Sequence, residues 1–184
     1  MNKKNGFTLI ELMVVVTIIG ILSGIGIFGI SNYIQEKKGE RPAISLWTDL
    51  MTLRAKALRD DCPYILTIDI SSSNYKTYKD KNSNYIIESG EEIKGAFLGS
   101  DTIQFITPPT TLSTVAGYTP SSGVIQGDWA VSNRIVIKND EVGSINSGVL
   151  FIQNTYSYKI FYALFTSGSM VTLWKWNGSK WYEI

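Results

Sequence analysis

Side chains that usually carry catalysis are scarce in this sequence. The chain of 184 residues has no histidine and a single cysteine, Cys62. A histidine-based triad cannot be built, and the usual zinc sites of cysteine and histidine are excluded as well. Cys62 follows two aspartates, which disfavour its thiolate, and it has no partner for an internal disulfide. We therefore expect a packing role for Cys62 and no enzymatic activity.

Oxygen-bearing side chains between residues 80 and 91 follow the spacing of a calcium-binding loop. They occupy positions 1, 3, 5, 9 and 12 of that pattern: Asp80, Asn82, Asn84, Glu88 and Glu91. Position 6, where the loop needs glycine for its sharp turn, is Tyr85. The alternative is a polar hairpin turn between residues 75–78 and 85–87. We favour the turn and predict neither a bound metal nor a cofactor.

Aromatic and basic residues alternate near the C-terminus. Three tryptophans fall on one face of the expected strands and two lysines on the other: Trp174, Trp176 and Trp181, with Lys175 and Lys180. Asn177-Gly178 predicts a two-residue hairpin turn that places Trp174 opposite Trp181. An exposed tryptophan face could stack on bases or sugars while the lysines contact phosphate. The other interpretation, which we favour, puts the tryptophans in the core and leaves the lysines as a solvated face.

The most informative feature is the apolar N-terminus. Residues 7–30 form a run of 24 whose clearly polar side chains are Thr8, Glu11, Thr17 and Ser23. As a helix the run is about 36 Å long, enough to cross a hydrocarbon core of about 30 Å. Lys3 and Lys4 ahead of it predict a cytoplasmic N-terminus, with the rest of the chain across the membrane. No small-x-small cleavage site follows, so we expect the run to be retained as a transmembrane helix.

The residues around Glu11 indicate a more specific function. The sequence Gly6-Phe7-Thr8-Leu9-Ile10-Glu11, between a short basic leader and an apolar helix, resembles the class III signal of type IV pilins and pseudopilins. The resemblance implies that a prepilin peptidase cuts after Gly6, removes the leader at residues 1–6 and methylates the new N-terminal amine of Phe7. It also implies that Glu11 pairs with the terminal ammonium of a neighbouring subunit and so sets the register of assembly. Such a pair offsets the desolvation of two charges in a helix bundle of low dielectric.

Glycines in the apolar run bear on helix packing. Gly20 and Gly24 have the small-xxx-small spacing that lets helices approach closely in lipid, although they equally lower helix propensity. Many major type IV pilins carry a proline near the position of Phe28, and many close a C-terminal loop with a cysteine pair. This sequence has neither feature. The pattern therefore favours a minor pseudopilin or minor pilin over a major pilin.

Residues 31–61 are expected to form the amphipathic second half of one long spine helix. Pro42, after Gly39, should kink or interrupt it around residues 38–41. Beyond the proline, two adjacent lines of mostly apolar residues recur with helical spacing: Ile44, Trp47, Met51, Arg54 and Leu58, and Leu46, Leu50, Leu53 and Ala57. Together they form one wide face that should pack on a globular domain. Pro63 ends the helix, because the residue before a proline disfavours helical conformation.

Beyond Pro63 the hydrophobic period changes to two, and β-branched and aromatic residues predominate. Short antiparallel strands are predicted at residues 64–70, 74–79, 85–88, 102–106, 134–138, 149–153, 158–164, 170–176 and 180–184. Residues 107–128, rich in proline, glycine and serine, are expected to form a long irregular loop. We therefore predict an α+β fold, in which the spine helix packs on a C-terminal antiparallel β-sheet or β-sandwich domain over residues 62–184.

The order of helix and strands, above all from Arg41 to Ala57 and into the strand after Pro63, resembles the GspH/FimT group of minor pseudopilins and minor pilins. This resemblance implies a subunit of a type II secretion pseudopilus or a type IV pilus filament. Its partners are then prepilin peptidase, other pilins or pseudopilins, an inner-membrane assembly platform and the lipid bilayer.

The same resemblance implies a single-pass inner-membrane protein whose C-terminal domain lies outside the cytoplasm, periplasmic or, in a filament, extracellular. The alternative function is a minor pilin that binds DNA or another ligand for DNA uptake or adhesion. A formal charge of +1 gives that alternative no strongly basic footprint.

Overall fold

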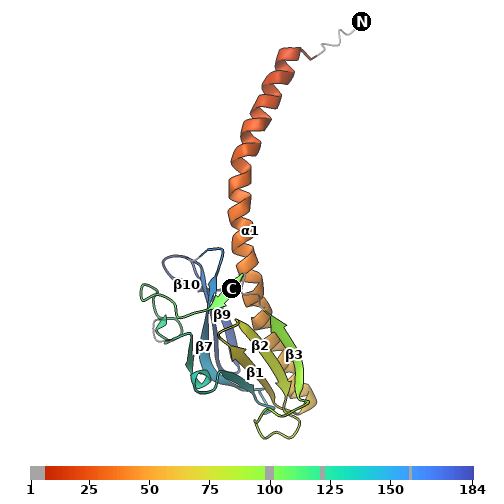
Figure 1. Ribbon diagram of the computed structural model, residues 1–184, viewed down its shortest axis with the longest axis vertical. Helices are drawn as coiled ribbons and strands as arrows, with labels where there is room; N and C mark the ends of the chain where they lie inside the picture. The colour runs from red at the N-terminus through yellow and green to blue at the C-terminus, as the bar shows by residue number, and fades with distance from the viewer. Residues whose placement is uncertain (1–6, 98–101, 121–122, 158) are drawn as a thin grey trace. The chain divides into compact units, whose positions relative to one another are not determined.

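The computed structural model describes residues 7–97, 102–120, 123–157 and 159–184. A long helix, α1 (Leu9–Asp60), precedes the strands (Figure 1). The chain divides into two compact units, Met1–Gln35 and Glu36–Ile184. The second unit, called the sheet domain below, contains the C-terminal half of α1 and all the strands.

α1 runs through Pro42 without interruption, so an interruption around residues 38–41 is wrong, whereas the expected kink stays a prediction. A proline removes one helical hydrogen bond and normally destabilises the turn before it. Here the turns on both sides are held by packing, because Gly39 and Ala43 are both buried. Tertiary contacts at these two positions outweigh the local preference against helix.

The C-terminal end of α1 confirms the prediction from the sequence. Asp61 adopts a left-handed conformation with φ of 47°. The N–H of Cys62 then donates to the carbonyl of Ala57, with an N···O distance of 3.3 Å. This is the pattern of a helix that ends in a left-handed residue, and Pro63 follows it directly.

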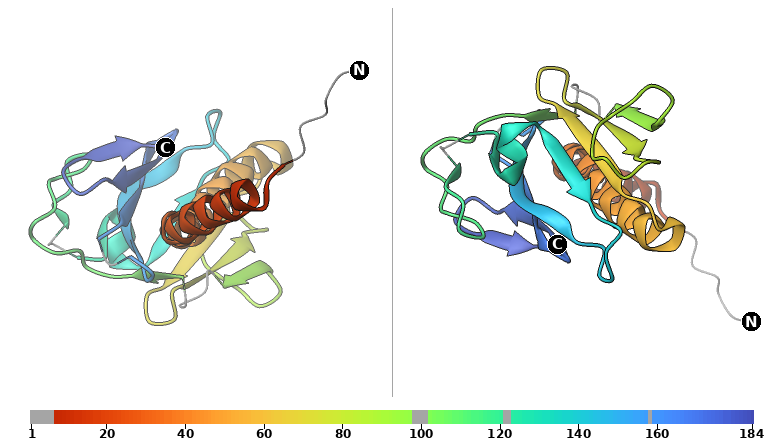
Figure 2. Two further views of the ribbon diagram at one scale, coloured as in Figure 1. Left: turned by 90° about the horizontal axis from the view of Figure 1, so that it is seen from above. Right: turned by 90° about the horizontal axis from the view of Figure 1, so that it is seen from below.

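One hydrogen-bonded sheet curves around the C-terminal half of α1 (Figure 2). Its strands are β1 (Tyr64–Asp69), β2 (Asn74–Lys79), β3 (Glu92–Phe97), β4 (Ile103–Phe105), β5 (Ile125–Gly127), β6 (Arg134–Ile137), β7 (Ile145–Asn154), β8 (Phe161–Gly168), β9 (Met170–Trp176) and β10 (Trp181–Glu183). The main path is β10-β9-β8-β7-β6-β1-β2-β3, and β4 and β5 also pair with β7. Each pairing is antiparallel, which confirms the predicted α+β class with an antiparallel sheet.

Three segments depart from the predicted pattern of strands. Residues 85–88 are not a strand, and the partner of β2 is β3, which the sequence analysis did not predict. β5 lies inside residues 107–128, which were expected to be irregular throughout. The predicted strand 158–164 begins at Phe161, and residue 158 lies outside the described residues.

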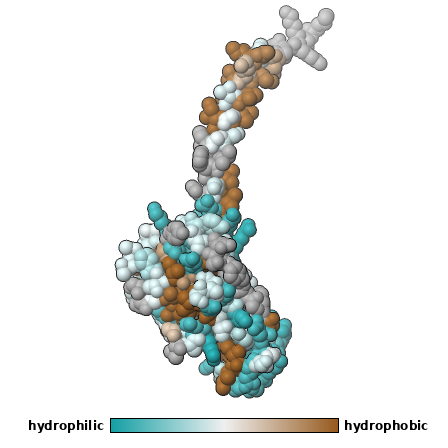
Figure 3. Space-filling model, in the orientation of Figure 1, coloured by the Kyte–Doolittle hydropathy of each residue, from teal (hydrophilic) through white to brown (hydrophobic). Residues whose placement is uncertain are grey.

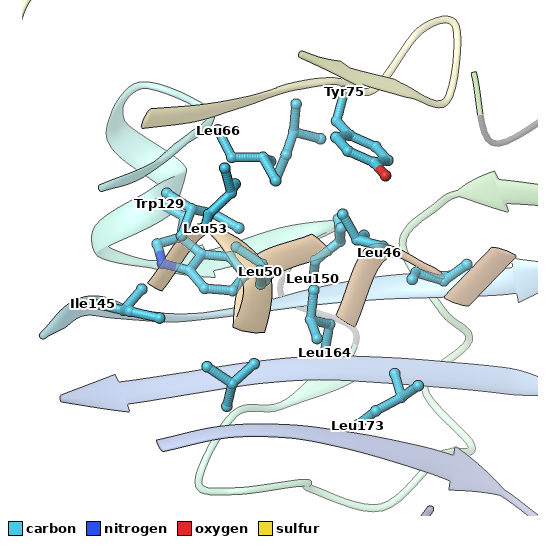
Figure 4. Close-up of a cluster of buried hydrophobic side chains, with 14 of the residues drawn as sticks. Leu46, Leu50, Leu53, Leu66, Tyr75, Trp129, Ile145, Leu150, Leu164 and Leu173 are labelled. Carbon is cyan, nitrogen blue, oxygen red and sulfur yellow. The ribbon is translucent and has the colours of Figure 1, made fainter. Parts of the chain in front are cut away.

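The main core lies between α1 and the concave face of the sheet (Figure 4). From the helix, the buried line is the second of the two predicted lines, extended by one residue: Ala43, Leu46, Leu50, Leu53 and Ala57. The first line is largely exposed, because Ile44, Met51 and Leu58 keep 39%, 37% and 45% of their surface. The wide apolar face was therefore predicted too broadly.

The opposite, convex face of the sheet is also covered. Side chains of β7 to β10 on that face, including Phe151 and Trp176, pack with Leu112 and Val115 from the long segment before β5. The indole N–H of Trp181 donates to the carbonyl of Ser113, at 2.8 Å. Hence the tryptophans take part in packing, as predicted, but under a loop on the face away from α1.

Candidate functional site

The start of α1 is capped by a reciprocal pair of side chains. Thr8 directly precedes the helix, and the backbone N–H of Glu11 donates to its hydroxyl oxygen at 3.3 Å. In return, the backbone N–H and the hydroxyl of Thr8 donate to one carboxylate oxygen of Glu11, at 3.0 and 2.9 Å. This is a capping box, which the Thr-x-x-Glu spacing could have revealed before the structure. The carboxylate of Glu11 therefore already has a role within its own helix.

The surface of the first unit is apolar and unburied (Figure 3). Phe7 keeps 81% of its surface exposed, and the large apolar residues from Leu9 to Leu22 keep about half or more. Apart from the adjoining residues and the backbone of the helix itself, no described heavy atom lies within 4 Å of where a Cβ would stand on Gly20 or Gly24. Their predicted part in helix packing is thus untested, as are the roles of Phe7 and Glu11, and Gly6 lies outside the described residues.

Across the residues that the structure describes, no helix combines the length and the apolarity of a membrane span. The transmembrane helix expected over residues 7–30 is not confirmed.

A buried ion cluster that the sequence analysis missed joins α1 to β9. Lys175 is 6% exposed and lies on the concave face of the sheet. Its ammonium donates to the carboxylates of Glu36 and Glu40, the second at 2.8 Å. Lys37 reaches Glu40 from the other side at 2.5 Å. The prediction that Lys175 belongs to a solvated face is therefore wrong, because the face opposite the tryptophans is the one that packs on α1.

The charges of this cluster stabilise one another. Burial disfavours the charged form of Lys175, but its hydrogen bonds to Glu36 and Glu40 raise the pKa of the ammonium above its ordinary value. Burial likewise opposes ionisation of Glu40, yet the hydrogen bonds from Lys175 and Lys37 hold its pKa below the ordinary value. The buried hydroxyl of Tyr162, whose residue stands opposite Lys175 on β8, has no hydrogen-bond partner among the described residues.

The hairpin that carries Lys175 also differs from the prediction. Trp181 pairs with Trp176, and the N–H of Asn177 donates to the carbonyl of Lys180 at 3.1 Å, so the two residues of the turn are Gly178 and Ser179, one position later than predicted. The side-chain oxygen of Asn177 accepts the backbone N–H groups of Ser179 and Lys180 at 3.0 and 2.9 Å. These bonds fix the shifted turn, which Asn-Gly alone does not indicate. With Lys175 buried, the expected pair of phosphate-contacting lysines is reduced to Lys180.

The loop between β2 and β3 uses the oxygens of the calcium pattern to bind its own backbone and amides. Asp80 is fully buried, and its carboxylate accepts the N–H groups of Asn84 and Tyr85 at 3.2 and 2.7 Å. Glu88 accepts the side-chain amides of Asn82 and Asn84, and Glu91 accepts the N–H groups of Lys81 and Glu88. Among the described residues, no group of three or more acidic, cysteine or histidine side chains could hold a metal. The loop is a polar connection, although it spans residues 80–91 rather than a short turn ending before a strand at residue 85.

Cys62 lies buried at the end of α1. Its thiol contacts the carbonyl of Asp80 at 2.6 Å, and burial raises its pKa. Both observations fit the predicted packing role, since a thiol that stays protonated is a poor nucleophile.

Comparison with known proteins points to the N-terminus. Residues 1–27 match the family model described as the prokaryotic N-terminal methylation motif. Prepilin peptidase-dependent protein D of Escherichia coli strain K12 is 61% identical over 36 residues, which are 20% of this chain and 25% of that protein. The matched stretch thus spans a quarter of the relative. A solved structure of the minor pseudopilin EpsH from the type 2 secretion system of Vibrio cholerae aligns over 80% of this chain and 96% of that one, with a TM-score of 0.46 and 9% identity.

Proposed function

We propose that this chain, whose N-terminus carries the prokaryotic methylation motif of prepilin-type proteins, is a filament subunit of the minor pseudopilin or minor pilin class. The match of residues 1–27 to that motif is the observation that carries the proposal. The related protein from Escherichia coli is named for its dependence on prepilin peptidase. By the same likeness, we assign cleavage after Gly6 and methylation of Phe7 to a prepilin peptidase.

The exposed apolar helix supports an assembled state. A stretch of large apolar side chains this exposed is not stable in water and needs lipid or protein around it. Before assembly the first unit is held by lipid of the inner membrane, with the sheet domain outside the cytoplasm. In the filament, the helices of neighbouring pilin-like subunits replace the lipid. The assembly platform in the inner membrane delivers the subunit, and the role is structural rather than enzymatic.

Processing is tested first, by intact-mass and N-terminal peptide analysis of the protein from its native membrane or sheared filaments. We expect a chain that begins at N-methylated Phe7. The variant Gly6→Val should remain heavier by the mass of residues 1–6, whereas the neighbouring control Asn5→Val should be processed normally. A mature-sized product from Gly6→Val, or an intact Met1 in the native protein, would refute the cleavage site.

The capping box allows a sharper test of Glu11. Glutamine can replace glutamate in a capping box, so Glu11→Gln removes the charge and keeps the cap. Thr8→Val removes the capping hydroxyl and keeps the charge. If Glu11 pairs with the ammonium of a neighbour, Glu11→Gln reduces incorporation into filaments while Thr8→Val assembles. Loss of incorporation in Thr8→Val with normal assembly of Glu11→Gln would assign the residue to helix capping alone.

A further inference from the structure

Four exposed cations and the partly buried Lys37 gather around one end of the sheet domain. They come from the start of its helical segment and from the connections β7–β8 and β9–β10, and they are called the basic cluster: Lys37, Lys38, Arg41, Lys159 and Lys180. The ammonium of Lys38 lies 5.3 Å from the ring centre of Tyr156 in the β7–β8 connection. Lys159 lines a cleft of about 300 Å³ together with Glu36 and Gly178 of the next connection. Three segments far apart in the sequence thus place positive charge on the same end.

The acids of this end neutralise only part of the basic cluster, in which Lys37 pairs with Glu40. Glu36 and Glu40 both also accept hydrogen bonds from the buried Lys175, whose single positive charge offsets one of their two negative charges. The start of the helical segment, the connections β7–β8 and β9–β10, and Lys175 together contribute six cations and the two carboxylates of Glu36 and Glu40. Residues 36–184 as a whole hold 15 Lys and Arg against 15 Asp and Glu. The sheet domain therefore has no net charge, but its charges are unevenly distributed, with an excess of positive charge at this end.

The opposite end of the helical segment is acidic by comparison. Asp60 ends α1, Asp61 follows it, and the β2–β3 loop beside them contributes Asp80, Glu88 and Glu91; these five acids stand against three cations, Arg59, Lys79 and Lys81. From residue 36 to residue 60, a helix rises about 36 Å. Several Debye lengths fit into that distance at physiological salt, where one is about 8 Å. A negatively charged surface that approaches the basic cluster is thus attracted to it, and repulsion from the acidic end is largely screened.

The place of the basic cluster in the chain identifies the surface it meets. Its first residue, Lys37, follows Ile34, the last exposed large apolar residue of the first unit, by three positions. If lipid holds the first unit, the first charged side chains to leave the apolar phase on this side are Glu36, which Lys175 binds, and then Lys37, Lys38 and Arg41. Lysine and arginine at that depth contact lipid phosphates and are attracted to anionic membranes.

We propose that the basic cluster binds the headgroups of anionic phospholipids and holds the sheet domain at the membrane surface before the subunit is assembled. The proposal rests on the proposed function, because it needs the first unit to be in lipid. Lys175 serves it indirectly, since its positive charge offsets one of the two carboxylates that would otherwise lower the charge of this end. Filament assembly then has to remove these lipid contacts.

The experiment uses the full chain in nanodiscs of phosphatidylcholine, with or without phosphatidylglycerol. An environment-sensitive fluorophore is attached to Ser179→Cys in the exposed β9–β10 connection, while the buried Cys62 stays unlabelled. We expect a blue shift of the emission that requires phosphatidylglycerol and fades as salt is added. Each positive charge removed should lower the ratio of membrane-bound to free domain about fivefold.

A matched pair of triple variants separates this site from general charge. The variant K38E/R41E/K159E should lose the lipid-dependent shift. The control K56E/K81E/K138E makes the same change in charge elsewhere on the sheet domain and should keep it. No response of the unmodified chain to phosphatidylglycerol, or equal loss in both variants, overturns the proposal.

Two further outcomes also decide the question. If the chain does not remain with the nanodiscs at all, the proposed function fails together with the lipid surface. If the chain stays in the discs but the emission wavelength does not depend on the lipid composition, only the lipid-binding role of the basic cluster is refuted. A last outcome is that the chain binds a duplex oligonucleotide more tightly than anionic nanodiscs at the same salt, and that K38E/R41E/K159E loses this binding. That result would assign the cluster to nucleic acid and overturn the lipid proposal.

Discussion

Replacing Lys175 by methionine should destabilise the sheet domain strongly. Methionine keeps the length of the side chain but removes the ammonium, which leaves the carboxylate of Glu40 close to the core with only Lys37 as a partner. Breaking a buried ion pair from one side costs about 3–5 kcal/mol. The lower end applies here, because Glu40 keeps Lys37 and the side chain of Glu36 is 39% exposed and can be hydrated. We expect a loss of about 3 kcal/mol.

For a domain of this size, that loss corresponds to a decrease in Tm of about 6–12 °C. Urea unfolding of the full chain in detergent measures the free energy, and thermal unfolding measures the Tm. Both are followed by tryptophan fluorescence, since Trp176 lies next to Lys175 in β9. The double variant Lys175→Met/Glu40→Gln should recover a large part of the loss, because the isolated charge is gone.

A neighbouring variant serves as the control. Tyr162→Phe removes a buried hydroxyl that has no partner among the described residues, so its free energy of unfolding should not fall and should rise by up to about 1–3 kcal/mol, the cost of an unsatisfied buried polar group. A loss below about 1 kcal/mol for Lys175→Met, or no recovery in the double variant, would refute the view that the cluster is an electrostatic unit.

Three further variants or conditions test other parts of the fold. Gly148→Ala should cost about 1–3 kcal/mol in urea unfolding, because the new Cβ would lie 2.6 Å from the ring of Trp129; an unchanged midpoint would contradict that contact. Leu50→Ala should cost about 2–5 kcal/mol, since Leu50 is fully buried between helix and sheet; calorimetry measures it, and a change near zero would remove Leu50 from the core. Hydrogen bonds from Arg59, Tyr64 and Lys79 hold the pKa of Asp60 below its ordinary value, so stability is lost as the pH falls below about 4; thermal unfolding between pH 7 and pH 2 should show this loss, and Asp60→Asn should reduce its slope.

Regular hydrophobic periodicity predicted those parts of the fold in which one face of a helix is buried. The line from Leu46 to Ala57 repeats at helical spacing, and those residues are buried. The helix ends at Asp60, because a proline three residues later excludes further helix. The N-terminal signal was likewise predicted from the sequence, because its chemistry lies in a few adjacent residues that need no tertiary contact.

The errors arose where a side chain overrides the local pattern. Residues 85–88 look like a strand, but the carboxylate of Asp80 binds the N–H of Tyr85 and holds it at a φ of 59°, outside the β region. In the last hairpin, the side chain of Asn177 binds the loop backbone and shifts the register by two residues. Neither interaction can be recognised from alternation alone.

The ion cluster was missed for a different reason. Lys175 lies on the same face of β9 as Val171 and Leu173, because side chains two residues apart in a strand point the same way. That alternation alone grouped Lys175 with buried residues. Only one face of this strand was expected to be buried, the face that carries the tryptophans, whereas both faces of β9 are covered. The partners Glu36 and Glu40 lie more than a hundred residues away in the sequence, and only the fold brings them together.

The middle of α1 depends on groups that are synthesised much later. Gly39 and Pro42 give residues 36–42 the weakest intrinsic helix propensity of the sheet domain's helical segment. That turn is bound by the amide of Asn154, which reaches the carbonyl of Glu36 across 118 residues of sequence, and by Lys175 across 139. At roughly 5–20 residues per second, a ribosome adds these groups about 6–30 s after the turn itself. The translation time of the sheet therefore sets the moment at which this part of the helix can become stable.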